Sequence, residues 1–452
     1  MSYPVLRNKT YFIRTFGCQM NLHDAERVSG LLDSCGCLEV ASPEEADIVV
    51  FMTCCVREAA DQRLYGQCSS CKSLPAPPSG KRVIAVGGCI AQRDGEGLLT
   101  NLDNVRVIFG TSSIAHVAEL LAQAFEDDER HVLTAEIDEP GATSMPWHRA
   151  TSYHAWVPIM TGCNNFCSYC IVPYVRGREK SRPFEEIVDE VCGLARAGVR
   201  EVTLLGQNVN SYGRDSYGSP RFAELLRAVG ETGIERIRFT SSHPKDLLPE
   251  TIDALAEVPQ VMPHLHLAVQ SGSSRILKLM NRRYSREDYL DLVRRVRERI
   301  PDIALTTDII VGFPGETEED FEQTLSLAEE ARFAQAFTFI YSKRAGTPAA
   351  EMPDDTPHEV IQERFDRLVH VIEQTAYDFN QHDLGARVPV LVEGVSKKDA
   401  RRIQGKSPKN QTVHAPVPEG IDPADLVGRI VDVDVDTART WYLAGSIVGE
   451  AR

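Results

Sequence analysis

The middle of the chain alternates β-forming and helix-forming segments six times, and this repeat limits the possible folds more than any other feature of the sequence. Amphipathic stretches of helical period, such as residues 184–197 and 318–331, separate the β-forming segments. Parallel strands need crossovers of this kind, so the repeat predicts a partial (β/α)6 barrel with functional groups at the C-terminal ends of its strands. The expected strands are residues 155–161, 201–206, 236–241, 264–270, 304–311 and 337–342.

The parts of the chain before and after this repeat have different patterns. Residues 9–125 alternate apolar runs with amphipathic stretches and predict a small α/β domain with a parallel sheet. Residues 126–150 begin with an acidic run and continue with proline and glycine, which is typical of a linker. The barrel then occupies residues 151–380. Residues 382–450 cluster β-forming segments without intervening helices and predict a small β-barrel, so the expected fold class is α/β with three domains.

Composition limits the compartment and the class of chemistry. Among the 452 residues no apolar stretch approaches the ~18 residues that a spanning helix needs, and the N-terminus lacks an export pattern, so we expect a cytoplasmic protein without membrane association. Twelve cysteines are many for a reducing compartment, where clustered thiols more often bind metal than form disulfides. A net charge of -16 argues against nucleic-acid binding by the whole surface but allows a local basic patch.

The sharpest chemical signal is a cysteine loop that directly follows the first predicted barrel strand. Cys163, Cys167 and Cys170 form a CxxxCxxC motif. A cubane 4Fe-4S cluster ordinarily takes four cysteines, so three leave one iron open for another ligand. S-adenosylmethionine can chelate such an iron, and an electron from the cluster can then break its carbon-sulfur bond to produce a carbon radical. A zinc knuckle or redox-active thiols are the alternative, but the run contains no fourth ligand.

The sequence around this loop resembles the radical S-adenosylmethionine superfamily and, within it, the methylthiotransferase family. The resemblance extends through the whole chain. Residues 239–244 are similar to the branch of the family that acts on isopentenylated adenosine in tRNA. The other segments that carry the resemblance are residues 15–21, 53–54, 56–58, 86–89, 174–179 and 206–210.

The resemblance implies a second, auxiliary 4Fe-4S cluster, held in the N-terminal domain by Cys18, Cys54 and Cys89. Each of these cysteines follows or ends a predicted strand, so all three could lie on loops at one edge of a parallel sheet. The family commonly has asparagine where Met52 stands, and Cys54 is followed directly by Cys55. Successive strand residues point to opposite faces, so only one of these two thiols can readily face a cluster. The motif favours Cys54, and we expect Cys55 to be a neighbour.

The remaining cysteines form no further site in this interpretation. Cys68 and Cys71 form an isolated CxxC pair, and Cys35 and Cys37 are also close in sequence. Such pairs are able to bind zinc or to form a transient disulfide, but no set of histidines or cysteines nearby completes a zinc site. We expect both pairs to be incidental, and Cys192, which lies in a helical pattern, to be a core residue.

Polar residues at the ends of the predicted barrel strands are candidates for contact with the nucleoside part of S-adenosylmethionine. The resemblance implies this role for Gln207, Gln270, Ser271 and Asp308. The resemblance also includes residues 312–316 in this region, but a tight strand-to-helix turn needs the same two glycines and proline, with Glu316 near the helix N-terminus. A structural interpretation therefore stands beside the functional one in this region.

Two groups of basic residues are candidates for contacts with RNA phosphates. Arg176 and Arg178 follow the cysteine loop, and the final β module concentrates six cations within the thirteen residues 397–409. A solvated protein face is the ordinary explanation of such a charge run. The module resembles the TRAM domain, an RNA-binding barrel, which favours a tRNA substrate over a protein one. The RNA-binding candidates in it are Lys397, Lys398, Arg401 and Arg402.

The resemblance implies a transferase that carries two 4Fe-4S clusters and S-adenosylmethionine and adds a methylthio group to carbon 2 of isopentenyladenosine beside the anticodon of tRNA. Its expected partners are tRNA, an electron donor such as flavodoxin or ferredoxin, and iron-sulfur assembly or carrier proteins. Alternative substrates are threonylcarbamoyl-adenosine in tRNA and an aspartate of a ribosomal protein, although residues 239–244 favour the first target. A non-catalytic alternative is an RNA-binding iron-sulfur scaffold for electron transfer, and the intact CxxxCxxC loop argues against it.

Overall fold

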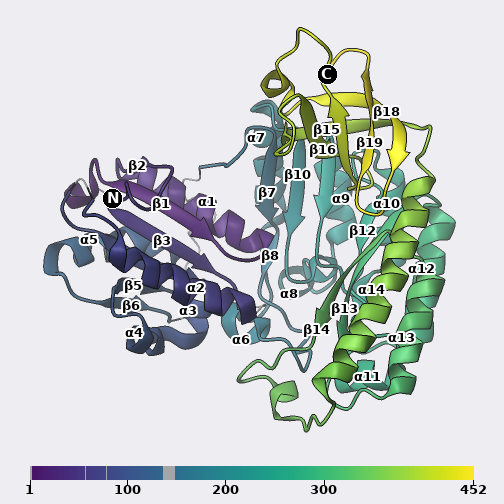
Figure 1. The fold of residues 1–452 in the computed structure, drawn as a ribbon, viewed down its shortest axis with the longest axis horizontal. Coiled ribbons are helices and arrows are strands. Elements are labelled where there is room, and N and C mark those ends of the chain that lie inside the picture. The colour runs from purple at the N-terminus through teal and green to yellow at the C-terminus, as the bar shows by residue number, and fades with distance from the viewer. Residues whose placement is uncertain (1–2, 56–57, 78, 136–147) are drawn as a thin grey trace. The chain divides into compact units, whose positions relative to one another are not determined.

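Two compact units make up the chain in the computed structural model (Figure 1). The structure describes residues 3–55, 58–77, 79–135 and 148–452. The first unit consists of Met1–Ala150, Gly162–Asn165 and Cys170–Arg178, and the second of Thr151–Thr161, Phe166–Tyr169 and Glu179–Arg452. Residues 56–57 of the methylthiotransferase motif and residues 136–147 of the predicted linker lie outside the described residues.

The first unit is built on a six-stranded sheet in which all neighbouring strands are parallel. Its strands are β1 (Thr10–Thr15), β2 (Leu38–Glu39), β3 (Ile48–Thr53), β4 (Val83–Gly88), β5 (Val105–Phe109) and β6 (His131–Leu133). They follow the order β2-β1-β3-β4-β5-β6. The helices are α1 (Gln19–Ser34), α2 (Glu58–Ser70), α3 (Cys89–Asp94), α4 (Leu98–Asn101) and α5 (Val117–Asp127). The predicted α/β domain with a parallel sheet is confirmed.

Two apolar cores cover the opposite faces of this sheet, because successive residues of β3 alternate between them. Val28 of α1 belongs to one core and Leu64 of α2 to the other. The second core also includes Ile171 and Val175, which place the short helix α6 (Val172–Arg176) in the first unit. The Thr111 hydroxyl donates a hydrogen bond of 2.8 Å to the Val175 carbonyl, so α6 is fixed by both packing and hydrogen bonding.

The second unit begins with six parallel strands that form the predicted partial (β/α)6 barrel. They are β7 (His154–Pro158), β10 (Glu201–Leu205), β11 (Arg236–Phe239), β12 (His264–His266), β13 (Ala304–Val311) and β14 (Gln335–Ile340). The strands form two three-stranded sheets, β11-β10-β7 and β12-β13-β14. The bridges Ile237–Val261 and Ser242–Leu267 join the two sheets. The predicted barrel is confirmed, although β12 ends at His266 rather than at Gln270, and beyond His266 the pairing continues only as isolated bridges at Leu267 and Gln270.

Helices follow the barrel strands as the sequence pattern predicts. They are α7 (Phe184–Arg196), α8 (Arg214–Tyr217), α9 (Phe222–Gly230), α10 (Pro249–Glu257), α11 (Ser274–Leu279), α12 (Arg286–Arg299), α13 (Glu318–Ala331) and α14 (His358–Gln381). Capping boxes at Ser285 and Thr317 satisfy the first backbone amides of α12 and α13. In the part of the chain that the structure describes, no helix is both long and apolar enough to cross a membrane.

The C-terminal part of the second unit is a closed β-barrel, which confirms the predicted small β-barrel. Its strands are β15 (Arg387–Val395), β16 (Arg402–Lys406), β17 (Thr412–Pro416), β18 (Ile430–Ala438) and β19 (Leu443–Val448), and they close in the order β15-β16-β17-β19-β18. The sequence pattern does not predict β16, because Ile403 is the one strong β-former among its five residues and charged side chains stand at both ends. A short antiparallel pair, β8 (Met160–Thr161) and β9 (Lys180–Ser181), flanks the cysteine loop.

Two buried arginines at the start of β11 attach this small barrel to the (β/α)6 barrel. The Arg236 guanidinium donates to the carbonyls of Pro389 and Lys406, at 3.0 and 3.1 Å. Arg238 donates to the Ser407 carbonyl at 2.7 Å and pairs with the buried Glu201 carboxylate at 2.9 Å. The C-terminal barrel therefore lies at the N-terminal end of β11, opposite to the strand end at which barrel sites are built.

Candidate metal centres

Cys18, Cys54 and Cys89 lie at the ends of three neighbouring parallel strands. Cys18 follows β1 and directly precedes α1, Cys54 follows β3, and Cys89 follows β4 and is the first residue of α3. The strand order places β3 between β1 and β4, and the register pairs Thr53 of β3 with Gly88 of β4. The structure therefore brings the three predicted auxiliary thiols to one edge of the sheet.

Two glycines make this approach of the strand ends possible. Gly17 has a φ of +137°, and a Cβ added there would lie 2.2 Å from the Cβ of Cys54. Gly88 has a φ of +94°, and a Cβ added there would lie 2.5 Å from the Thr53 carbonyl oxygen. A side chain at either position would push the strand ends apart, so the turns form a cradle that only glycine permits.

A network of hydrogen bonds ties the strand ends to one another. The Asn21 side-chain nitrogen donates to the Thr53 carbonyl at 2.5 Å, and the Cys18 thiol lies 3.7 Å from the Asn21 side-chain oxygen. The Thr53 hydroxyl donates to the Gly87 carbonyl at 2.7 Å and accepts from the Ile90 amide at 3.2 Å. Asn21 and Thr53 thus link the segments that carry all three thiols.

Arg176, which the sequence suggests as an RNA contact, lies inside the first unit instead. Its side chain is 6% exposed. One guanidinium nitrogen donates both to Asp24 Oδ2, at 2.9 Å, and to Asn21 Oδ1, at 3.0 Å. The expectation of an RNA contact at this residue is therefore corrected, because helix α6 points Arg176 at the polar start of α1.

The thiols at this edge differ in their acidity. A hydrogen bond from Cys54, reinforced by the Arg176 charge against the effect of burial, lowers the pKa of Cys18 to about 6. A hydrogen bond from Cys55, again reinforced by Arg176, lowers the pKa of Cys89 to about 7. The same hydrogen bond and burial raise the pKa of Cys55. Because the thiolate is the form that ligates metal, Cys18 and Cys89 are prepared as ligands.

The adjacent cysteines Cys54 and Cys55 have different neighbours, as the alternation of strand residues predicts. Cys54 lies against Gly17 and Cys18, and Cys55 packs with Cys89 in an apolar core. No group of three or more histidine, cysteine or acidic residues in the described ranges is arranged around a single metal ion. A cubane cluster offers each cysteine its own iron, so its thiols stand further apart than the ligands of one ion.

Four other cysteines of the first unit are placed in or beside its apolar cores. Cys68 and Cys71 are 0% and 8% exposed, and burial raises the pKa of Cys68 to about 12. Cys37 is buried and its thiol donates to the Leu6 carbonyl at 3.3 Å, while Cys35 is partly buried beside the same core. These thiols have the environment of packing residues rather than of ligands.

The CxxxCxxC loop follows β7 and β8. Cys163 and Cys170 are partly exposed, and the Cys163 amide donates to the Gly177 carbonyl at 3.1 Å. Cys167 is 9% exposed, and a guanidinium nitrogen of Arg282 lies 3.8 Å from its sulfur. Phe166, at the centre of the loop, has a φ of +44°. Sequence reasoning did not identify Arg282, whose only local signal is the pair of arginines that follows α11.

The predicted S-adenosylmethionine contacts lie at the C-terminal ends of the barrel strands. Gln207 follows β10 and is partly exposed. Gln270 and Asp308 are joined through the backbone, because the Gln270 amide donates to the Asp308 carbonyl at 2.8 Å. The Asp308 carboxylate lies 3.4 Å from His266 Nε2. Ser271 is fully buried; its hydroxyl accepts from the Ser273 amide at 3.2 Å and lies 3.4 Å from the Thr324 hydroxyl of α13.

Buried polar atoms without a partner among the described residues mark the same strand ends. Asn208 and Asn210 follow β10, Ser242 follows β11, and Glu316 follows β13. Each has a buried side-chain oxygen without a hydrogen-bond partner, and Asn210 also a nitrogen. Burial raises the pKa of Glu316 to about 7. Sequence reasoning included Glu316 in the candidate turn 312–316 but did not select Asn208, Asn210 or Ser242, although each of these follows a predicted strand.

The basic residues of the C-terminal barrel form a surface with aromatic side chains. Lys397, Lys398 and Arg401 are exposed, and Arg402 is partly exposed on β16. The His414 ring, whose pKa is lowered by burial and by the charges of Arg402 and Lys398, stands at 77° to the Tyr442 ring with centroids 5.5 Å apart. The exposed side chains of Trp441 and Tyr442 complete the surface. The other two cations of this region have partners within the protein. The Lys406 ammonium donates to the Thr412 hydroxyl, and Lys409 forms an ion pair with Asp383. Arg178 is exposed.

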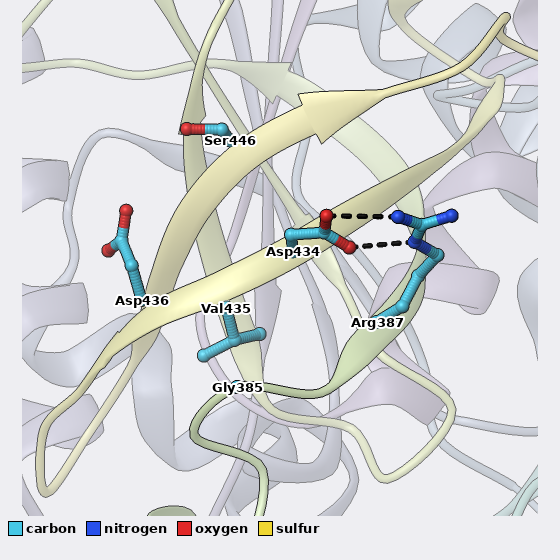
Figure 2. A pocket seen from close by; sticks show the side chains of 6 residues that line it. All are labelled: Gly385, Arg387, Asp434, Val435, Asp436 and Ser446. Carbon is cyan, nitrogen blue, oxygen red and sulfur yellow. Dashed lines mark hydrogen bonds and ion pairs between the residues drawn. The ribbon is translucent and has the colours of Figure 1, made fainter.

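A hollow of about 630 Å³ on the outside of the C-terminal barrel contains none of these groups (Figure 2). The Arg387 guanidinium and the Asp434 carboxylate face each other there in a bidentate ion pair with distances of 2.7 and 3.0 Å. The hollow is shallow and lined partly by acidic side chains, and no cysteine contributes to it. Its lining residues are Gly385, Arg387, Asp434, Val435, Asp436 and Ser446.

Three family models match successive parts of the chain. The radical SAM superfamily matches residues 157–328. The uncharacterized protein family UPF0004 matches residues 10–110, which include the strands that carry Cys18, Cys54 and Cys89. The TRAM domain matches residues 381–448.

Known relatives match almost the whole chain. The tRNA-2-methylthio-N(6)-dimethylallyladenosine synthase of Acetivibrio thermocellus is 48% identical over 98% of this chain and 92% of its own length. The enzyme of the same name from Acidothermus cellulolyticus is 52% identical over 90% of this chain and 83% of its own length. Among solved structures, the radical S-adenosylmethionine methyltransferase TsrM from Kitasatospora setae has a TM-score of 0.56 at 15% identity, and the match covers 76% of this chain and 77% of TsrM. This last similarity concerns the fold.

Proposed function

The chain belongs to the family of radical S-adenosylmethionine tRNA-2-methylthio-N(6)-dimethylallyladenosine synthases, and we propose that it adds a methylthio group to carbon 2 of isopentenyladenosine beside the anticodon of tRNA. The observation that carries this proposal is the presence of two separate sets of three cysteines. One is the CxxxCxxC loop that follows β7, and the other is the set at the ends of β1, β3 and β4.

The residues of both sets fit the cofactors of this family. The glycine cradle and the lowered pKa values of Cys18 and Cys89 suit a bulky cluster held by thiolates. When bound, the two 4Fe-4S clusters and S-adenosylmethionine supply the electron, the carbon radical and the sulfur. Cys163, Cys167 and Cys170 would hold the barrel cluster, and Cys18, Cys54 and Cys89 the auxiliary one.

The ends of the barrel strands supply the binding groups of this chain. Asn208, Asn210, Ser242 and Glu316 hold buried oxygens without a partner among the described residues, and such atoms are costly unless a ligand satisfies them. Together with Gln207, Gln270 and Asp308 they would bind polar atoms of S-adenosylmethionine and of the target adenosine. Binding there would orient the reacting carbon and exclude water from it.

The C-terminal barrel would bind the tRNA away from the reacting base. Lys397, Lys398, Arg401 and Arg402 can neutralise phosphates, and the rings of Trp441 and Tyr442 can stack on bases, which is the usual combination in single-strand binding sites. Arg178 is a further candidate for contact with tRNA.

The chemistry of the family supports further partners and a compartment. Cleavage of S-adenosylmethionine needs an external one-electron donor, for which flavodoxin or ferredoxin is suited. Sulfur that leaves with the product must be replaced, which supports a role for iron-sulfur assembly or carrier proteins. The tRNA substrate and the reduced thiols support a cytoplasmic location.

The test is anaerobic reconstitution followed by iron counting and mass spectrometry of isopentenylated tRNA after incubation with reductant, sulfide and S-adenosylmethionine. About eight irons per chain and a methylthiolated adenosine are expected. Modification of threonylcarbamoyl-adenosine or of a ribosomal protein, with isopentenylated tRNA unchanged, would contradict the substrate. Failure to cleave S-adenosylmethionine by a fully loaded chain would favour a non-catalytic scaffold.

A further inference from the structure

We propose that Arg176 and Asp24 are positioning residues that set the reduction potential of the auxiliary cluster, with the arginine raising it and the carboxylate lowering it. The inference rests on the proposed function, because it requires a cluster on Cys18, Cys54 and Cys89. It adds that the environment of this cluster is tuned by a buried pair of opposite charges on two segments far apart in the sequence.

The contacts of the pair connect it directly to the thiols. Arg176 Nη2 lies 2.9 Å from Asp24 Oδ2 and 3.0 Å from Asn21 Oδ1, and the same Asn21 oxygen lies 3.7 Å from Cys18 Sγ. The side chains of Arg176 and Asp24 are each 6% exposed. The Arg176 guanidinium, the Asn21 amide and the Asp24 carboxylate therefore lie next to Cys18, a predicted ligand. The two charged side chains have almost no contact with solvent.

The backbone holds Arg176 in this position. Val175 is 3% exposed in the core of the first unit, and its carbonyl accepts the hydrogen bond from Thr111. Asp24 lies in the second turn of α1, the helix that begins directly after Cys18. Because both charges stand on packed helices, their separation from the thiols is set by the fold rather than by flexible side chains.

The direction of each effect follows from electrostatics. Reduction adds one negative charge to a cluster already surrounded by thiolates, so a nearby cation stabilises the reduced form and a nearby carboxylate destabilises it. Burial keeps salt from screening either charge. His23 Nδ1 lies 3.8 Å from the other oxygen of Asp24, and Arg27 is a further charged group that acts on this carboxylate.

The segment that carries Arg176 also carries Cys170, a predicted ligand of the barrel cluster, six residues earlier. One short stretch of chain thus supplies a thiol to one cluster and the neighbouring charge to the other. Removal of the Arg176 charge is expected to affect the auxiliary cluster and to leave the ligand set of the barrel cluster unchanged.

The test measures reduction potentials by titration with spectroscopic detection in the full-length chain. Replacement of Cys163, Cys167 and Cys170 by alanine leaves the auxiliary cluster as the only signal, so that its potential is read alone. In this background we expect Arg176→Gln to lower the potential, Asp24→Asn to raise it, and Arg176→Lys, which keeps the charge, to stay near the parent value. A merely structural role for these residues would give shifts of the same sign.

The matched control is Arg282→Gln, measured in a chain in which Cys18, Cys54 and Cys89 are alanine. Arg282 stands 3.8 Å from Cys167, so its loss is expected to lower the potential of the barrel cluster. In the background that retains only the auxiliary cluster, the same change should have no effect. Arg176 would then act on the auxiliary cluster alone, and Arg282 on the barrel cluster alone.

Shifts of the same sign in Arg176→Gln and Asp24→Asn, or unchanged potentials in loaded chains, would overturn the proposal. If Arg176→Gln loses its iron, the other two variants test the proposal. Asp24→Asn must still raise the reduction potential, and Arg176→Lys must still leave it unchanged. No tRNA is needed for these measurements, so a negative result in the modification assay leaves them interpretable.

Discussion

Gly17 is the position at which a single methyl group should disturb the auxiliary site most directly. Its φ of +137° is rarely adopted by residues with a side chain, and a Cβ added there would lie 2.2 Å from Cys54 Cβ and 3.0 Å from Cys54 Sγ. The backbone strain of Gly17→Ala costs about 1–3 kcal/mol. Displacement of the Cys54 side chain adds an overpacking cost of about 1–3 kcal/mol. The free energy of unfolding of the N-terminal domain should therefore fall by about 2–6 kcal/mol.

Hydrogen exchange and iron counting together measure this effect. In Gly17→Ala, exchange of the amides of β1 and β3 should become faster in the metal-free chain, and the reconstituted chain should hold about four irons rather than about eight. Gly66→Ala is the matched control, because Gly66 lies in α2 and an added Cβ there meets nothing within 4 Å. Alanine at that helical position should stabilise α2 by about 0.5–1 kcal/mol. Full iron content and unchanged exchange in Gly17→Ala would refute the reasoning that the turn has no room for a side chain.

Three further predictions concern other parts of the molecule. Cys54→Ala should lose about four irons on reconstitution while Cys55→Ala keeps them, and equal losses in both would show that Cys55 also ligates. Arg238→Met should destabilise the second unit by about 3–5 kcal/mol, because it leaves a buried carboxylate without its partner, and thermal unfolding measures this loss. Lys397→Ala combined with Lys398→Ala should weaken tRNA binding and reduce the slope of log Kd against log salt by about 2 if both contact phosphates. An unchanged slope would place the tRNA on another surface.

The sequence predicts the architecture because its signals are local. The sequence predicts the barrel strands because short β-forming segments alternate with amphipathic stretches of helical period. The short edge strands β2 and β6, of two and three residues, give no such signal. The sequence also fails to predict β16, because Ile403 is the one strong β-former among its five residues and the cations at its two ends resemble those of a basic loop.

In the candidate site, too, the sequence predicts local features and misses contacts between distant residues. The residue types and spacing of the CxxxCxxC loop, and the motifs around Cys18, Cys54 and Cys89, indicate iron-sulfur chemistry without any knowledge of contacts. The role of Arg176 was misjudged, because a basic residue after a cysteine loop has the same local pattern whether it faces solvent or a buried carboxylate. The Arg176 side chain is only 6% exposed, and this burial depends on the packing of α6 against the sheet.

The sequence by itself determined the kinds of secondary structure, the division into an α/β domain, a (β/α) barrel and a β-barrel, and the cysteines able to carry clusters. Only the tertiary structure decided which residues meet. The order β1-β3-β4 brings three distant strand ends to one edge, and Arg176 reaches Asp24 across 152 positions of the chain. The physical reason is that periodicity and turn residues act within a few positions of the backbone, whereas the contacts of a buried charge are set by the packing of the whole domain.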